Sequence, residues 1–312
     1  MLEILSDTRW GGVAAITAIL STGVAIWQYF HHRKGAASGA IKIASDKPGI
    51  LSLADRFLLA FKAHEIEPAQ IPRYIQGVAL ADLARNDKLI AALNYEVIAE
   101  TCQRFNLRQD WLEGKNVPIY PRPTFYKQLD AFVDFIAEIT SKHKNIRGFA
   151  VKSHEDKLKK EGPYDLPIVL LFAASIDDWE QSTGEPVWSY FITNDQYSWG
   201  YRNARYHIKA MTYIVHAFGI HTFGCQLNRD DICQILAGKI FPGPLLEDVS
   251  HVAWYPEDYM YTDGESAALK DHDEAVKVHE WLNKHGVLRH LVDHAERIRL
   301  HGNKINNRAI TL

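Results

Sequence analysis

The densest group of side chains that could do chemistry lies between Trp188 and Lys209, in the run WSYFITNDQYSWGYRNARYHIK. Aromatic rings can stack on a planar ligand, and arginine or lysine near a helix start can meet an anion. The pattern therefore predicts a site for a small planar or anionic ligand, or for a partner. The alternative is that these rings only pack at a strand-to-helix corner. The residues expected to form the site are Trp199, Tyr201, Arg202, Arg205 and Lys209.

Fifteen histidines raise the question of a metal site. His290 and His294 are four residues apart, so on a helix they share one face. The sequence has no H-E-x-x-H motif, no closely spaced cysteine pair and no acidic third ligand at a fixed spacing from them. We therefore interpret them as part of a solvated basic face, and we predict no metal and no cofactor.

The chain carries none of the common catalytic motifs. It has no G-x-S-x-G elbow, no G-x-x-x-x-G-K-[ST] phosphate loop and no glycine-rich dinucleotide turn. The carboxylate pairs Asp177-Asp178 and Asp230-Asp231 fall at an expected turn and helix start, where aspartate is favoured for capping alone. Catalytic residues can be scattered along a sequence, so an enzyme stays the alternative interpretation, with its catalytic residues unknown.

The composition excludes several classes of protein. With 312 residues, 47% hydrophobic and 23% charged, the chain is long enough for about two folded domains and is neither a disordered tail nor a polytopic membrane protein. Its net charge of −3 argues against a strongly basic nucleic-acid-binding surface. The three cysteines, Cys102, Cys225 and Cys233, are too scattered for a disulfide framework and are expected to be reduced.

Residues 10–30 contain no charged side chain. About 20 apolar residues can cross a bilayer as a helix, and the aromatic residues at both ends of this run suit the membrane interface. The cationic cluster HHRK follows at residues 31–34. We therefore expect residues 1–34 to be an inner-membrane anchor, with a single pass and the C-terminal body in the cytoplasm. The spacing of small residues in the run would also suit a homodimer.

Residues 35–50 have the small, polar composition of a linker, and residues 51–116 show short amphipathic segments typical of an all-helical domain. Asn94 is a good N-cap for the helix that follows it, and Asn106 can take the left-handed turn that ends that helix. A short last helix buries Trp111 and Leu112.

The run from Asn94 to Gly114, NYEVIAETCQRFNLRQDWLEG, resembles the closing helix pair of the Xre/Cro/lambda-repressor-like helix-turn-helix domains, and residues 53–75 resemble their first two helices. The resemblance implies DNA binding, with Gln70, Arg73 and Arg85 near the DNA. The chain departs from the family at Glu65, where a glycine is common, and at Pro72.

The charge of this helical segment tests the implied function. Residues 51–116 contain eight Lys or Arg and nine Asp or Glu, whereas a DNA-binding domain normally presents a basic face. A protein partner is therefore as good an expectation as DNA for this module.

After the proline-rich stretch 118–123 a second domain is expected over residues 124–312. An amphipathic helix should begin at Thr124, followed by strands at 147–152, 167–174 and 187–193 and then by several helices. The short intervals between the strands favour antiparallel pairing. We therefore expect an α+β fold with a small, mainly antiparallel sheet.

Taken together, the sequence predicts a bacterial-type, membrane-anchored regulatory or signalling protein that acts by binding. It would join a helix-turn-helix-like module to a sensing or docking domain. The alternative is a membrane-tethered enzyme or toxic effector, for example in phage defence, with catalysis in the C-terminal domain.

Overall fold

The computed structural model describes residues 52–154, 158–160, 167–176, 186–247, 254–259 and 272–300. These residues belong to one compact unit, Ala40–Leu312. Its first part is helical: α2 (Leu53–Ala63), a 3₁₀ turn (Pro68–Gln70), α3 (Ile71–Tyr74), α4 (Asn86–Ala92), α5 (Tyr95–Phe105) and α6 (Gln109–Leu112).

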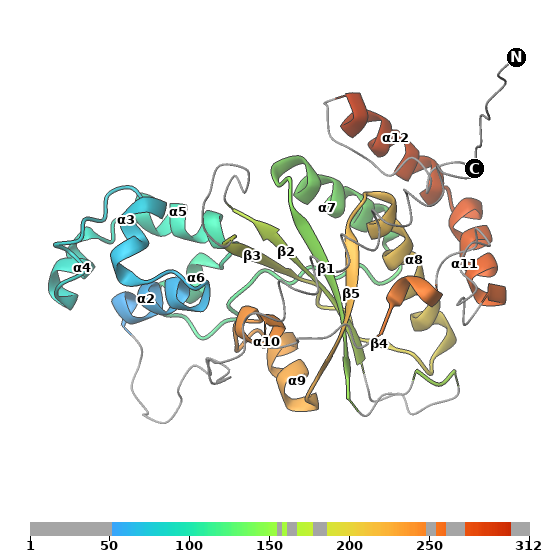
Figure 1. Ribbon diagram of the computed structural model, residues 1–312, viewed down its shortest axis with the longest axis horizontal. Coiled ribbons are helices and arrows are strands. Elements are labelled where there is room, and N and C mark those ends of the chain that lie inside the picture. Colours follow the sequence, from blue (N-terminus) through green and yellow to red (C-terminus); the bar gives the residue numbers. More distant parts are fainter. Residues whose placement is uncertain are drawn as a thin grey trace, which may run out of the picture. The chain divides into compact units, whose positions relative to one another are not determined.

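The second part contains the sheet and the helices around it. In chain order these are α7 (Leu129–Lys142), β1 (Ile146–Ser153), β2 (Pro167–Ser175), β3 (Trp188–Ile192), β4 (Tyr197–Ser198), α8 (Arg202–Ala217), β5 (His221–Leu227), α9 (Arg229–Ala237), α10 (Gly243–Glu247), a 3₁₀ turn (Pro256–Tyr259), α11 (His272–Lys284) and α12 (Val287–Leu300) (Figure 1).

The strands form one mixed sheet in the order β3-β2-β1-β5, with β4 pairing to β2. β2 runs antiparallel to β1 and β3, whereas β5 runs parallel to β1. After β3 and β4, α8 carries the chain back across the sheet to β5 at its other edge, which provides the crossover that parallel strands need. Three of the four strand pairings are antiparallel, as expected, but the sequence analysis missed β5, whose parallel pairing with β1 makes the sheet of this α+β fold mixed.

No helix in the part of the chain that the structure describes is long and apolar enough to cross a membrane. The longest, α8, has 16 residues and includes charged side chains, whereas about 20 apolar residues are needed. The helix expected at residues 10–30, like the linker at 35–50, lies outside the described residues. The single-pass inner-membrane localisation expected from the sequence is therefore not supported, and that part of the fold prediction is corrected.

Both faces of the central strand β2 are buried, which explains its continuous apolar run. Ile168, Leu170 and Phe172 face a core shared with α7, α8, α11 and α12. The alternate residues Val169, Leu171 and Ala173 face a second core. Helices therefore cover the sheet on both sides.

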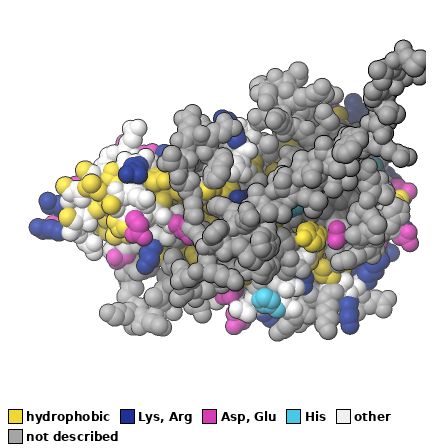
Figure 2. All heavy atoms as spheres, viewed as in Figure 1, with side chains coloured by type: hydrophobic (Ala, Val, Ile, Leu, Met, Phe, Trp, Pro, Cys, Tyr) yellow, Lys and Arg dark blue, Asp and Glu magenta, His cyan; other side chains and the backbone are white. Residues whose placement is uncertain are grey.

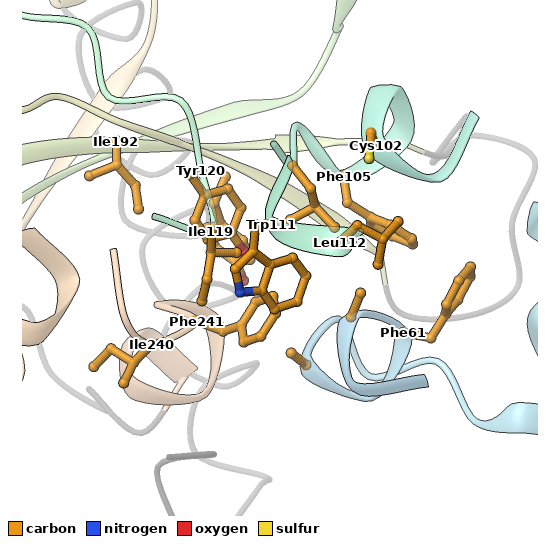
Figure 3. Close-up of a cluster of buried hydrophobic side chains, with 14 of the residues drawn as sticks. Phe61, Cys102, Phe105, Trp111, Leu112, Ile119, Tyr120, Ile192, Ile240 and Phe241 are labelled. Atoms are coloured by element: carbon orange, nitrogen blue, oxygen red, sulfur yellow. The ribbon is translucent and has the colours of Figure 1, made fainter. Parts of the chain in front are cut away.

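The second core joins the sheet to the helical segment. Trp111 of α6 packs edge-on against Phe241, with ring centroids 5.6 Å apart, and Tyr120 contacts the same ring (Figure 3). Ile119 and Tyr120, within the proline-rich stretch, are fully buried here. The helical segment and the α+β segment thus share hydrophobic packing along residues 118–123.

The local signals in α5 are confirmed. The Asn94 side chain accepts a hydrogen bond from the Val97 amide at 2.9 Å, and Asn106 ends the helix in the left-handed conformation with φ +53°. The Asn106 amide also donates to the Tyr190 carbonyl of β3 at 2.8 Å. The residue that ends the helix therefore ties it to the edge of the sheet.

The prediction that a helix begins at Thr124 is wrong, because α7 begins at Leu129. The carboxylate of Asp195 accepts hydrogen bonds from the Thr124 hydroxyl and from the amides of Phe125 and Tyr126. Lys127 then adopts φ +62°, which a helix does not permit. A buried side chain some 70 positions away thus outcompetes local helix propensity.

Candidate functional site

The corner between β3 and α8 holds the five residues that the sequence predicts as a ligand site. Trp199, Arg205 and Lys209 are buried, whereas Tyr201 and Arg202 reach solvent. The structure therefore gathers three of the five in the interior and leaves two at the surface. This division follows from α8 itself, since positions 205 and 209 share the helix face that packs on the core.

A single carboxylate binds both buried cations. Glu274 of α11 accepts hydrogen bonds from Arg205 Nε at 2.9 Å and Arg205 Nη2 at 2.7 Å, and from Lys209 Nζ at 2.8 Å. Arg205 also donates to the Trp199 carbonyl at 2.5 Å, and the Lys209 ammonium lies 5.4 Å from the Trp199 ring centroid. The predicted cations thus bind a residue of the chain itself.

The electrostatics of this ion cluster are those of a satisfied buried network. Burial alone would raise the pKa of Glu274, but hydrogen bonds from Arg205 and Lys209 outweigh it and hold that pKa well below its ordinary value. A buried charge without a partner costs several kcal/mol, so these three groups depend on one another. Sequence reasoning missed Glu274 because it lies 65 positions beyond Lys209, with no local pattern to connect them.

Next to this network, His207 is held as a neutral imidazole. Its Nε2 accepts a hydrogen bond from the Lys127 amide at 3.0 Å, and its ring stacks with Tyr197 at an interplanar angle of 9°. Burial lowers the pKa of His207 to about 4, against an opposing effect of Asp195. A neutral acceptor here supports the irregular backbone before α7 and is interpreted as structural.

A second buried imidazole, His64, lies in the helical segment. Its Nδ1 bonds to the Ala60 carbonyl at 2.6 Å, and its ring stacks on Phe105 with centroids 4.3 Å apart. Burial lowers its pKa to about 4. Like His207, it behaves as part of the packing.

A cavity of about 1530 Å³ lies beside the edge strand β3, between α5 and α7. Its walls come from α5, α6, α7, the residue before β1 and the strands β2 and β3, and most of the lining residues are polar. We call it the edge groove. Its polar lining includes Glu100, Gln103, Arg104, Asn106, Gln109, Glu138, Lys142, His143, Lys144, Asn145, Ser175 and Ser189.

A smaller pocket of about 450 Å³ adjoins the edge groove and shares with it Asn106, Glu138, Lys142 and Phe191. Its other walls are more apolar, with Pro121, Pro123, Phe135, Ile139 and Ile192. We call it the anchor pocket. A polar groove that continues into an apolar pocket offers both hydrogen bonds and a place to bury an apolar group.

Charges in the edge groove are largely paired along its rims. Arg104 lies 3.3 Å from Glu100 on α5, and Lys142 lies 2.6 Å from Glu138 on α7. His143 Nδ1 bonds to the Ser175 carbonyl at 3.1 Å, and burial lowers the pKa of this imidazole. The groove therefore presents a balanced polar surface instead of a concentrated field of one sign.

The three residues that the helix-turn-helix resemblance assigns to DNA have different surroundings. Gln70 accepts from the Glu67 amide at 2.9 Å, Arg73 is exposed on the four-residue α3, and Arg85 pairs with Asp87 at 2.6 Å. By the resemblance, residues 77–86 would supply the recognition helix, but no helix begins there before α4 at Asn86. On the face shown in Figure 2, basic and acidic side chains are interspersed over this segment. DNA binding by these residues stays a prediction from resemblance.

Among the described residues, one cluster has ligand atoms placed to hold a metal ion. The carboxylate of Asp134 on α7 lies 2.9 Å from Nε2 of both His290 and His294 on α12. The sequence pairs the two histidines but does not reveal Asp134, which is more than 150 positions away.

No protein-family model, curated protein or solved structure matches this chain.

Proposed function

We propose that this chain is a regulatory binding protein whose edge groove receives an extended peptide segment of a partner protein. The observation that carries the proposal is the continuity of a polar groove of about 1530 Å³ with the apolar anchor pocket. Small-molecule sites are mostly between about 300 and 1,000 Å³, so the edge groove exceeds what a small ligand fills. An extended segment with one apolar side chain fits both parts.

The chemistry of the lining supports a peptide. Gln103 of α5 and Asn145, which precedes β1, both line the groove, and both side chains can donate to and accept from a peptide backbone. The Phe191 ring and the Phe135 ring, 6.3 Å apart, offer an apolar surface at the anchor pocket. Balanced rim charges favour recognition by hydrogen bonding and shape over attraction of a highly charged ligand.

The proposal replaces the corner at Trp199 as the main binding surface. Arg205 and Lys209 are bound to Glu274, so a ligand would have to break a buried ion cluster to reach them. The edge groove requires no such rearrangement, because its lining side chains already border open space.

Selection from a displayed library of random peptides on the full-length chain tests the proposal. Peptides that bind are synthesised with a fluorescent label, and their affinity is measured by anisotropy. We expect an apolar anchor residue common to the selected peptides. Asn145→Trp and Gln103→Trp, which put an indole into the groove, should weaken binding by about tenfold or more, equivalent to at least about 1.4 kcal/mol.

The matched control is Glu96→Trp, because Glu96 is exposed on the same helix as Gln103 but does not line the groove. It should leave peptide affinity unchanged. Equal affinity for wild type and both groove variants, or no peptide recovered in repeated selections, would contradict the proposal.

A further inference from the structure

The cluster of Asp134, His290 and His294 connects two helices that are far apart in sequence. Asp134 Oδ1 lies 2.9 Å from Nε2 of His290 and 2.9 Å from Nε2 of His294. The two imidazole rings are 4.8 Å apart and nearly perpendicular. All three candidate ligand atoms lie within 4.8 Å of one another.

The helices that carry these side chains are held in place by packing next to them. On α7, Val133 and Ala137 are buried on either side of Asp134 in sequence. On α12, Leu288 and Leu291 are buried in the same core. Because α7 packs against α12 through this core, the backbone positions that carry the three ligand side chains are held in place.

From this geometry we infer that Asp134, His290 and His294 bind a divalent first-row transition-metal ion, with Zn²⁺ as the probe of choice. Two imidazoles and one carboxylate are a common donor set for such ions. Bonds of about 2.0–2.1 Å in tetrahedral geometry place ligand atoms about 3.3 Å apart, close to the 2.9 Å contacts here.

Solvent exposure decides what kind of site this is. The side chains of Asp134, His290 and His294 are 59%, 34% and 18% exposed, so water can reach the ion from the Asp134 side. The ion would keep at least one coordination position for water or an outside ligand. It would also link α7 to α12, so binding should stabilise the docking of α12.

Binding exchanges one set of contacts for another. In the ion-free cluster each Nε2–H donates to the carboxylate; on binding, each imidazole gives up that proton position to the metal and carries its hydrogen on Nδ1. Without the ion, both N–H groups donate to the same oxygen, Asp134 Oδ1. The ion would replace these two donors with a single centre that carries two positive charges. The affinity should fall in acid because protonated imidazole cannot ligate.

Zn²⁺ titration of the full-length chain, purified without a histidine tag and stripped with a chelator, tests this inference. Calorimetry should show one equivalent of Zn²⁺, and Co²⁺ in its place should give visible absorption of a low-coordinate site. His290→Ala, His294→Ala and Asp134→Asn should each reduce the affinity for Zn²⁺ about tenfold or more.

Two exposed residues provide matched controls. His285→Ala removes another histidine close to α12, and Asp130→Asn removes a carboxylate one turn before Asp134 on α7. Neither should change the Zn²⁺ affinity. Far-ultraviolet circular dichroism and the denaturant midpoint of each ion-free variant establish that any loss of binding is not unfolding.

The readouts separate the possible outcomes. One-equivalent binding that is lost in all three ligand variants and kept in both controls supports the inference. Binding that persists in the ligand variants, several weak equivalents that are insensitive to them, or no binding at all would overturn it. Peptide affinity at the edge groove is measured independently, so failure here leaves the proposed function standing.

Discussion

Two clusters of charged and titratable side chains, both completed by the C-terminal helices, differ in what surrounds them. In the inner cluster, Glu274 of α11 binds Arg205 and Lys209 of α8, with side-chain exposures of 10% or less. In the outer cluster, His290 and His294 of α12 meet Asp134 of α7 at the surface. The inner cluster is buried and its charges are paired, whereas the outer one brings two imidazole nitrogens and a carboxylate together where solvent reaches them.

The difference shows that the density of chemically capable residues is a poor guide to a site. The Trp188–Lys209 run is the richest in the sequence, yet its two buried cations bind within the chain. The outer cluster is sparse in sequence, yet its three candidate ligand atoms lie within 4.8 Å of one another. What separates the two clusters is burial: the inner groups are shielded from water, whereas the outer groups are hydrogen-bonded to one another but exposed to solvent.

The largest effect should come from breaking the inner cluster. Glu274→Ala leaves Arg205 and Lys209 buried without a counter-charge, so we expect a loss of about 3–5 kcal/mol in the free energy of unfolding. Urea denaturation followed by circular dichroism measures it. Glu280→Ala, which removes an exposed carboxylate on the same helix, should stay within about 0.5 kcal/mol of wild type. A loss below about 1 kcal/mol in Glu274→Ala would mean that the inner cluster contributes little.

The second-largest effect should be a dependence of the unfolding free energy on pH that comes from the buried imidazoles and not from the exposed ones. The pKa values of His64 and His207 are about 4 in the folded chain, below the ordinary 6.5, so the unfolded chain takes up these protons first. Their contribution to stability is complete above pH 6.5 and is lost as the pH falls toward 4, by about 3 kcal/mol for each residue.

Unfolding free energies measured between pH 7 and 5 check this expectation before ordinary carboxylates titrate. The slope against pH should be shallower in His207→Gln and in His64→Gln than in wild type, even though both variants are less stable. His285→Gln, at an exposed position, should keep the wild-type slope. Identical slopes in all four proteins would contradict the buried-imidazole interpretation.

The smallest effect on stability should come from breaking the outer cluster in the metal-free protein. Asp134→Asn removes an exposed partner of His290 and His294, and exposed pairs contribute only about 0–1 kcal/mol. Chelator-treated Asp134→Asn should therefore unfold at nearly the same urea concentration as Asp130→Asn. A loss comparable to that of Glu274→Ala would show that the outer cluster is a structural ion pair, and the contrast between the two clusters would disappear.

Local signals along the chain predict several elements well. Asn94 and Asn106 bound α5 as expected, because an N-cap and a left-handed stop depend on backbone geometry within a few residues. The three predicted strands correspond to β1, β2 and β3, since their apolar patterns reflect burial on one or both faces.

Local sequence patterns do not predict the features that depend on contacts between residues far apart in the chain. The start of α7 depends on Asp195, the sheet becomes mixed through β5, and the partners of both clusters come from residues more than 60 positions apart. None of these pairings leaves a periodic trace in the sequence. The edge groove likewise arises from elements that meet only in the folded chain.

The sequence by itself therefore determined the short-range features of this protein: helix caps, apolar strands and the pairing of His290 with His294 on one helical face. Only the tertiary structure decided which charged groups pair with one another and how deeply each pair is buried. The physical reason is that hydrogen bonding and desolvation depend on distances in space, and packing of the core brings Glu274 to Arg205 and Asp134 to the two histidines.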